Sequence, residues 1–365
     1  MFLIITRNFP PDVGGIQILM GGLSENLLNH GPVKVFANEF PNSEAYDTKS
    51  SINIERVKGI KLFRKYRKAN IVNNFINDNS NIRAVITDHW KSLELLKQEY
   101  LNKTKTFCLI HSKEINHPIG SYLNKRMIKS ISKANFIIAN SNYTKNLAVK
   151  VGVDSSKIKI IFPGINKPKN IDEKYKREAD KIFNNSFPKI ITVARLDKRK
   201  GHDKILMLIK NLKNKFPKIK YVSLGFGEEE KNLKKLAKEL KIENEVVFIK
   251  HHDENMKIAL IEKSNLFLMP SRIEKKSVEG FGISFVEAAS YGVGSIGGKD
   301  GGASDAIAHN KTGLICDGND LNSIYESIIN FFEKDNYVKF GNSALKLSEN
   351  FYWDKIVKNY LKLIN

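Results

Sequence analysis

Short runs of apolar residues, many of them β-branched, alternate with longer amphipathic stretches along the whole chain. Residues 16–29, 203–216 and 228–240 carry apolar side chains at the spacing of helices that bury one face. Strands that alternate with helices are typical of parallel sheets with crossover helices, so the pattern predicts an α/β fold of doubly wound parallel sheets. The predicted strands are FLIIT, VKVFA, AVITD, TFCLIH, NFIIAN and IKIIF in the first half of the chain and KIITVA, KYVSLG, VVFIK, NLFLMP, GSIGG and GLICD in the second.

A segment rich in proline and charge separates the two sets of strands. Residues 163–189 show little apolar periodicity, which favours a linker. The chain has 365 residues, more than a single hydrophobic core usually supports, so two domains are expected. The predicted parts are a Rossmann-like domain at residues 1–165, a linker at 166–188, a second Rossmann-like domain at 189–348 and a C-terminal helix at 349–365.

The composition is that of a globular protein with an excess of basic residues. Hydrophobic residues make up 41% of the chain, and 60 Lys and Arg against 39 Asp and Glu give a net charge of +21. The opening MFLIIT is too short for a signal sequence, and no later apolar run approaches the roughly 18 to 20 residues of a membrane span, so we expect a cytoplasmic protein. Cys108 and Cys316 lie in separate apolar runs without metal-ligand spacing, which predicts buried free thiols.

The densest basic cluster is RVKGIKLFRKYRK at residues 56–68, where Leu62, Phe63 and Tyr66 stand among the cations. Basic residues interleaved with apolar ones favour an anionic membrane surface or an anionic acceptor. Lys is also abundant on evident solvent faces elsewhere, so a solvated basic face is an equal alternative, and nucleic acid is the least favoured partner. The residues of this candidate patch are Arg56, Lys58, Lys61, Arg64, Lys65, Arg67 and Lys68.

Glycine-rich loops follow several predicted strands and precede helices, where free backbone N–H groups and the helix dipole favour anions. In PPDVGGIQ, Gly14 and Gly15 precede the first helix, although a plain tight turn would explain them equally well. The stretch LGFGEEEKNL lacks the third glycine of a dinucleotide-binding loop, and its acidic residues are explained by the helix dipole.

The loop VARLDKRKGHD places four cations between a predicted strand and the next helix. Cations at the carboxyl end of a parallel strand are suited to clamp a diphosphate, and a solvated basic turn is the alternative. The chain has no D-x-D motif and no His, Cys or Asp grouping with metal spacing, so we expect no metal and no bound cofactor. The four cations are Arg195, Lys198, Arg199 and Lys200.

The stretch VEGFGISFVEAAS contains two glutamates that need different explanations. Ser284 and Glu287 fit the S-x-x-E capping box, so Glu287 has a structural reason to be there. Glu279, ahead of GFG, has no such reason. We therefore expect Glu279 to contact a ligand.

The chain resembles the retaining, nucleotide-sugar-dependent glycosyltransferases of family four over nearly its whole length. The resemblance implies the GT-B fold, in which two Rossmann-like domains face each other across a cleft, the first on the acceptor side and the second binding the nucleotide sugar. The wording SRIEKKSVEGFGISFVEAA is closest to the mannosyltransferase-like members. The chain departs from the family at Pro32 and at Gly292-Val293-Gly294, which lacks the family's proline. The matching stretches, in the family's order, are PPDVGGIQ, CLIHSKE, IIANSNYTK, IIFPGIN, VARLDKRKG, LGFGEEEKNL, NLFLMPSR, VEGFGISFVEAAS and GGASDAI.

The resemblance assigns donor-binding roles where positions match. Arg195 and Lys200 would grip the donor diphosphate, and Gly15, beside Gly14, would approach it from the other domain. Glu279 would bind hydroxyls of the transferred sugar, and Glu287 would bind the ribose. The backbone N–H groups that would meet sugar and phosphate belong to Phe281, Gly282 and Ile283.

The resemblance also places a histidine in the active site. His111 matches the family's histidine beside the sugar, supported by Glu114, whereas the residues alone favour a strand-end histidine bonded to backbone. The C-terminal helix with Trp353 matches the family's tail, which crosses back to the first domain; by its apolar stripe alone it would close the second domain. The loop near the nucleotide base would contain Lys250, His251, His252 and Asp253.

The implied activity is retaining, metal-independent transfer of a hexose from a nucleotide diphosphate sugar, GDP-mannose or a UDP-hexose, to a glycan or lipid-linked acceptor. The implied setting is surface polysaccharide or glycolipid synthesis, in the cytoplasm or peripherally on the inner face of the membrane. Alternatives are a nucleotide-sugar epimerase of the same fold and a basic nucleic-acid-binding protein. The latter lacks stacking-aromatic and groove-helix motifs, so we expect no nucleic-acid partner.

Overall fold

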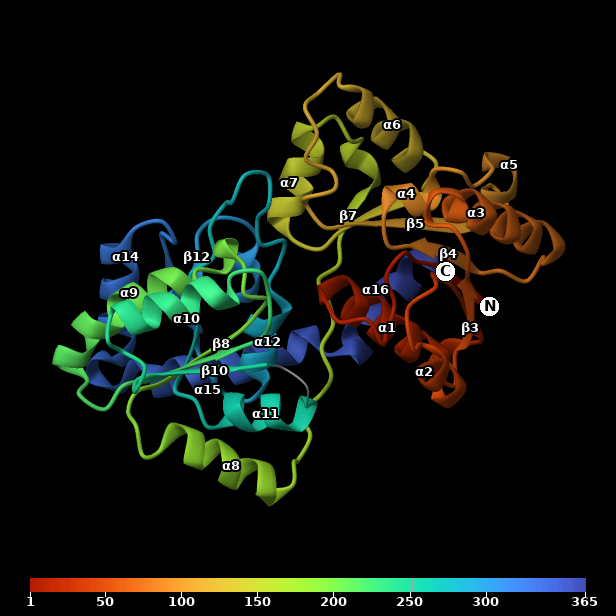
Figure 1. Cartoon of the computed structure of the whole chain (residues 1–365). Coiled ribbons are helices and arrows are strands. Elements are labelled where there is room, and N and C mark those ends of the chain that lie inside the picture. The colour runs from red at the N-terminus through yellow and green to blue at the C-terminus, as the bar shows by residue number, and fades with distance from the viewer. Residues whose placement is uncertain (251–252) are drawn as a thin grey trace. The chain divides into compact units, whose positions relative to one another are not determined.

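The computed structural model describes residues 1–250 and 253–365 of the chain. They form two compact units: unit 1 comprises Met1–Asn166 and Phe351–Asn365, and unit 2 comprises Lys167–Asn350. Each unit is built on one parallel sheet whose strands are joined by helices (Figure 1). The predicted α/β class with two doubly wound, Rossmann-like domains is confirmed.

The sheet of unit 1 has seven strands in the order β3-β2-β1-β4-β5-β6-β7. Its inner strand β1 (Phe2–Ile5) is apolar at every position because both faces are covered, which is usual for parallel sheets. Leu3 and Ile5 enter the core beneath α3 and α6, whereas Phe2 and Ile4 enter the core shared with α1 and α16. The strands are β1 (Phe2–Ile5), β2 (Val33–Asn38), β3 (Asn53–Val57), β4 (Ala84–Thr87), β5 (Lys105–Ile110), β6 (Phe136–Ala139) and β7 (Ile158–Ile160).

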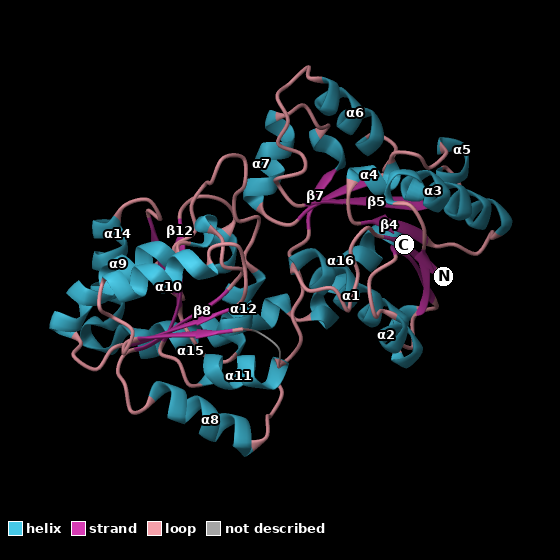
Figure 2. Cartoon of the chain, in the orientation of Figure 1, coloured by secondary structure: helices cyan, strands magenta, loops and turns pink. Residues whose placement is uncertain are grey.

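The helices of unit 1 lie in two layers, with α1, α2 and α16 on one side of the sheet and α3 to α7 on the other (Figure 2). Helix α16 packs on α1 through Trp353, since a Cβ added at Gly22 would lie 2.4 Å from its ring. The helices are α1 (Gly15–Leu27), α2 (Glu44–Lys49), α3 (Lys61–Asp78), α4 (Trp90–Leu93), α5 (Gln98–Leu101), α6 (Tyr122–Ile131), α7 (Asn142–Lys150) and α16 (Trp353–Ile364), with 3-10 turns at Leu28–His30, Ser155–Lys157 and Glu349–Phe351.

The sheet of unit 2 has six strands in the order β10-β9-β8-β11-β12-β13. Its two faces bury different side chains: Leu268 enters the core beneath α9 and α14, and Phe267 packs on Phe285 of α12, with ring centroids 5.4 Å apart. The strands are β8 (Lys189–Val193), β9 (Lys220–Leu224), β10 (Val246–Ile249), β11 (Leu266–Met269), β12 (Ser295–Gly298) and β13 (Gly313–Cys316). The helices are α8 (Glu173–Phe183), α9 (His202–Lys215), α10 (Glu230–Glu239), α11 (Glu254–Glu262), α12 (Ile283–Ser290), α13 (Ala303–Ala306), α14 (Leu321–Phe332) and α15 (Asn336–Ser348), with 3-10 turns at Lys198–Lys200 and Glu333–Asp335.

Two elements differ from the sequence prediction. Strand β3 was not predicted, because its polar side chains interrupt the apolar run of this edge strand. The segment 166–188 is not simply a linker, since helix α8 occupies part of it and packs on α11. The signal for α8 is small: Ala179 and Phe183, four residues apart among charged residues, are its buried positions. Cys108 and Cys316 are buried and free, as predicted.

Candidate functional site

The loops that follow β8 and β11 meet at the carboxyl edge of the unit 2 sheet, where these two strands are neighbours. The loop after β8 ends in Gly201, whose φ of 79° is left-handed and favours glycine. A Cβ at Gly201 would also lie 2.5 Å from the carbonyl oxygen of Pro270, just after β11. This close approach of the two loops brings cations of the first to a carboxylate of the second.

That carboxylate is Glu279, and it binds two cations at once. Arg199 Nη1 donates to Glu279 Oε2 at 3.0 Å, and Lys200 Nζ donates to the same oxygen. The three side chains are only 10 to 12% exposed. Burial by itself would raise the pKa of Glu279, but Lys200 and Arg199 outweigh it and lower the pKa to about 2. Glu279 is therefore an ionised, weakly basic hydrogen-bond acceptor.

The backbone of Glu279 is fixed by the segment GGASD. Gly302 N donates to Glu279 O at 2.9 Å, and Gly301 pairs with Glu279 in a short parallel bridge. A Cβ on Gly301, whose φ is 98°, would lie 2.2 Å from that same carbonyl oxygen. The predicted ligand contact Glu279 is thus held by both its main chain and its side chain.

Helix α12 begins without a side-chain cap, and this corrects the predicted capping box. Gly282 is the N-cap, with a left-handed φ of 88°, and Ser284 lies inside the helix as its second residue. The predicted segment of Phe281, Gly282 and Ile283 lies at this helix start, where the helix itself supplies no acceptor for the first N–H groups. The S-x-x-E pattern is therefore wrong as an explanation of Glu287.

The actual partner of Glu287 is Lys257 on α11. Lys257 Nζ lies 3.2 Å from Glu287 Oε1 and 2.8 Å from Glu254 Oε1, and the Lys257 side chain is 8% exposed. Burial by itself would lower the pKa of Lys257, but the two carboxylates raise it above its ordinary value. Sequence spacing gave no signal for this contact, since α11 and α12 are separated by β11 and a long loop.

The two predicted clamp cations have different surroundings. The Arg195 side chain is 67% exposed, and Asp197 Oδ2 lies 3.7 Å from it. Lys200 is in the buried cluster with Glu279, together with Arg199, which the motif comparison did not assign. In the sequence, the feature that points to Arg199 is its place among the four cations of this loop.

In unit 1, α1 starts at Gly15 with Gly14 as its N-cap and without a side-chain cap. A Cβ on Gly15 would meet no atom within 4 Å. The first N–H groups of α1 thus have no side-chain partner at the cap, and Gly15 leaves room beside its Cα, a setting suited to an anion.

His111 follows β5 and is half-buried. Its Nε2 lies 3.0 Å from the carbonyl oxygen of Asp88, and its backbone N–H donates to the carboxylate of Glu114. Because a carbonyl only accepts, the neutral ring carries its proton on Nε2 and presents Nδ1 as an acceptor. The backbone-bonded histidine predicted from the residues alone is therefore observed, and within the described part of the chain no residue bonds Nδ1.

The residues predicted near the base are partly described. The Lys250 side chain is 60% exposed, with Nζ 3.9 Å from Glu230 Oε2. Asp253 caps α11 by accepting from Asn255 N at 2.8 Å. His251 and His252 lie outside the described residues.

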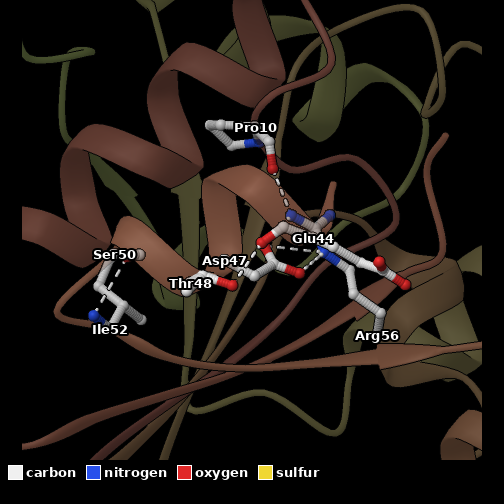
Figure 3. Close-up of polar contacts among 7 residues, drawn as sticks. All are labelled: Pro10, Glu44, Asp47, Thr48, Ser50, Ile52 and Arg56. Carbon is white, nitrogen blue, oxygen red and sulfur yellow. Dashed lines mark hydrogen bonds and ion pairs between the residues drawn. The ribbon is translucent and has the colours of Figure 1, made fainter. Parts of the chain in front are cut away.

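Two members of the predicted basic patch are buried, which corrects their assignment as surface groups. The Arg56 side chain is 7% exposed and bonds Asp47 through Nε and Nη2 at 2.9 and 2.7 Å (Figure 3). It also donates to the carbonyl of Pro10. Lys68 Nζ donates to Thr6 O at 2.7 Å and to Asn38 Oδ1 at 2.9 Å, and burial lowers its pKa to about 8.

The rest of the patch is an exposed, mixed surface at the start of α3. Arg64 and Arg67 fold onto the carbonyls of Gly59 and Lys58. The exposed fractions of the apolar side chains here are 70% for Ile60, 71% for Leu62, 56% for Phe63 and 54% for Tyr66, and the interleaved cations Lys58, Lys61 and Lys65 are exposed too.

Membrane-spanning helices and metal-ligand clusters are both absent from residues 1–250 and 253–365. No helix in them combines the length and apolar character that a membrane span requires. No group of three or more His, Cys, Asp or Glu in them is arranged to hold a metal ion.

The chain matches two family descriptions, one in each half. Residues 157–351 match "Glycosyl transferases group 1", and residues 13–168 match "Glycosyltransferase Family 4".

Similar proteins include a "GDP-mannose-dependent alpha-(1-6)-phosphatidylinositol monomannoside mannosyltransferase" of Mycobacterium tuberculosis, 23% identical over 97% of this chain and 95% of the relative. A "GDP-mannose-dependent monoacylated alpha-(1-6)-phosphatidylinositol monomannoside mannosyltransferase" of Corynebacterium glutamicum is 22% identical over 91% of this chain and 88% of the relative.

Solved structures show the same fold. The Anabaena protein Alr3699/HepE in complex with UDP has a TM-score of 0.82 at 16% identity, covering 100% of this chain and 99% of that chain. Sucrose-phosphate synthase from Thermosynechococcus elongatus has a TM-score of 0.78 at 17% identity, covering 99% and 98%.

Proposed function

The chain belongs to the group 1 glycosyl transferases, and from this we propose that it is a retaining hexosyltransferase that uses a nucleotide diphosphate sugar. In this proposal the donor is GDP-mannose or a UDP-hexose, and the acceptor is a hydroxyl of a glycan or a lipid-linked glycan. The names of the two mannosyltransferase relatives support GDP-mannose, and the UDP complex of a structural neighbour supports UDP. The observation that carries the proposal is the cluster of Arg199, Lys200 and Glu279 at the carboxyl edge of the unit 2 sheet.

The proposed reaction forms a bond from the anomeric carbon to the acceptor oxygen and breaks the bond from that carbon to the diphosphate. The leaving phosphate oxygen accepts the acceptor's proton on the same face, so no protein carboxylate acts as a nucleophile. Glu279, with its pKa lowered to about 2, suits hydroxyl binding better than proton abstraction. Arg195 and Lys200 would stabilise the departing diphosphate by their charge, without a metal ion.

Several further groups have proposed contacts with the donor. Glu287, oriented by Lys257, would accept hydrogen bonds from the ribose, and Lys250 and Asp253 would lie near the base. The N–H groups at the starts of α12 and α1 would bind phosphate oxygens. His111 would accept a sugar hydroxyl at Nδ1.

The exposed face at the start of α3 supports peripheral binding to an anionic membrane on its cytoplasmic side, in surface polysaccharide or glycolipid synthesis. Apolar side chains flanked by lysines can enter the headgroup region while their cations meet lipid phosphates.

The proposal is tested by a thermal-shift screen of UDP- and GDP-sugars, because a bound donor stabilises the folded state in proportion to its occupancy. The stabilising donor is then incubated with lipid-linked and soluble glycans, and NMR of the product reads the anomeric configuration. An inverted product would overturn the retaining mechanism. Conversion of the donor without acceptor would instead indicate an epimerase, and a gel shift at physiological salt would indicate nucleic-acid binding.

A further inference from the structure

Three exposed cations gather at the carboxyl ends of β1 and β4 in unit 1. The buried basic residues Arg56 and Lys68 are not among them. Arg7 comes just after β1, and its backbone N–H donates to Asp88 Oδ2 at 2.9 Å. Asp88 directly follows β4, which pairs with β1 up to Ile5 opposite Thr87. Lys91, three residues later on α4, therefore lies near Arg7.

The third cation, Lys65, comes from α3. It stands one turn before Lys68, whose Nζ donates to the carbonyl of Thr6 at 2.7 Å. Because Thr6 adjoins Arg7, this contact places Lys65 over the same strand end. The electrostatics agree: burial and then the charge of Arg7 lower the pKa of Lys91, and Lys65 contributes in the same direction.

The carboxylates around these cations already have partners. Asp88 accepts from Thr6 Oγ1 at 3.0 Å and from Ser92 Oγ at 2.7 Å, in addition to the Arg7 N–H. Glu94 forms a two-pronged pair with Arg126, at 2.6 and 2.8 Å. Across the described residues, no carboxylate lies within ion-pair distance of Arg7, Lys65 or Lys91. Glu94 still acts on Lys91 and Lys65 through its charge, but within the described residues none of the three cations is held in an ion pair.

A hydrogen-bond donor stands beside these cations. His89 is 8% exposed, and its Nδ1 accepts from the backbone N–H of Lys91 at 2.9 Å. Burial first, and then the charge of Arg7, lower its pKa to about 2, so the ring is neutral and carries its proton on Nε2. In the part of the chain that the structure describes, no acceptor bonds this N–H. It is not one of the fully buried polar atoms that lack a partner, so it reaches solvent and can donate to a ligand.

We propose that Arg7, Lys65 and Lys91, with the His89 N–H, bind the phosphate group of the acceptor substrate. Three cations and one neutral donor match a tetrahedral anion with several oxygens and up to two charges, and Arg can bind two of those oxygens at once. That the bound phosphate belongs to the acceptor rests on the proposed function. That these residues bind a phosphate does not depend on it. The phosphate is either part of a lipid headgroup or part of a soluble phosphorylated sugar.

The site is tested with glycerol 3-phosphate as the probe, on the full chain with UDP and GDP present so that phosphate sites for the nucleotide are filled. Line broadening of the probe's ³¹P resonance at constant ionic strength gives its Kd. The variant is Arg7→Gln with Lys91→Gln, which keeps both backbone N–H bonds, to Asp88 and His89. We expect its Kd to rise at least about tenfold, because hydrogen bonds to charged groups are worth that much or more.

The matched control is Lys49→Gln with Lys150→Gln, which removes the same charge from exposed positions on α2 and α7. Equal affinity for the probe in the variant and the control would overturn the proposal.

Sedimentation with phosphatidylglycerol and phosphatidylcholine vesicles separates the two sources of the phosphate, a lipid headgroup and a soluble phosphorylated sugar. If the variant no longer binds vesicles and the probe competes with vesicles for the wild type, the phosphate belongs to a headgroup. If the wild type binds the probe but shows neither of these vesicle effects, the phosphate belongs to a soluble molecule. Since no step needs donor turnover, the site stands or falls separately from the proposed transferase activity.

Discussion

The two units hold cations at the carboxyl edges of their sheets in opposite ways. In unit 2, Arg199 and Lys200 are nearly buried and share the carboxylate of Glu279. In unit 1, Arg7 and Lys91 are exposed and have no carboxylate partner among the described residues. A buried charge needs a partner because its loss of hydration costs several kcal/mol, whereas an exposed charge does not. The unit 2 cluster is therefore part of the fold as well as a candidate site, while the unit 1 cations are free to meet a ligand.

The largest expected effect is on the stability of unit 2. Glu279→Gln leaves two mostly buried cations without a carboxylate, so we expect the free energy of unfolding to fall by about 3 kcal/mol. Chemical denaturation at neutral pH measures it. The control Glu230→Gln breaks surface pairs with Lys234 and Lys250, whose side chains are 53% and 60% exposed, and should leave the free energy of unfolding nearly unchanged. Equal losses in the two variants would show that the Glu279 cluster is not a folding element.

The same carboxylate gives the pH dependence. Its pKa is lowered from 4.5 to about 2 in the folded protein, so its stabilisation is present above pH 4.5 and is lost as the pH falls toward 2. The stability gap between the wild type and Glu279→Gln should narrow over that range. A gap that stays constant down to pH 2 would contradict the pairing.

The next effect separates the exposed clamp cation from the buried one. Both Arg195→Ala and Lys200→Ala should lower transfer about 100-fold, as loss of a single electrostatic donor does. Only Lys200→Ala should also destabilise the fold, because Arg195 is 67% exposed. Steady-state rates and denaturation curves, with Lys198→Ala as the control from the same loop, measure both. Full turnover in either variant would refute the clamp.

A smaller effect is expected at Lys257, which orients Glu287. Lys257→Met should weaken nucleotide binding about tenfold and leave the rate at saturating donor nearly unchanged, because ribose contacts do not change during transfer. Lys257→Arg should restore part of the affinity. Lys263→Met is the control, since it also breaks an ion pair, with Asp180, but does not touch Glu287. Unchanged nucleotide affinity in Lys257→Met would remove Glu287 from the ribose site.

The smallest effect concerns the exposed face of α3. Leu62→Ser with Phe63→Ser should lower binding to anionic vesicles several-fold without changing stability, because both side chains are more than half exposed. Cosedimentation at two salt concentrations measures it, and Val149→Ser, an exposed position on α7, is the control. If the double variant binds as the wild type does, the face is solvent surface only.

Much of the architecture follows from local patterns. Each predicted apolar run forms a strand, because a run buried on both faces needs no knowledge of its neighbours to be recognised. Glu279 was singled out because it lacked a local explanation, and the structure places it in a charged cluster. Local patterns fail where local cues are weak, as in β3 and α8, or where two explanations compete, as in the capping box of Glu287.

The partners of charged side chains were decided only by the tertiary structure. By sequence, Arg56 and Lys68 belong to a basic cluster, yet Asp47 and Asn38 bind them in the interior. Glu287 and Lys257 are thirty residues apart and meet because the fold brings one residue of α11 to one residue of α12. The sequence by itself determined which segments are buried, since burial follows from the apolar pattern. Which charges are paired and which remain free depends on contacts between distant segments, and only the folded chain makes them.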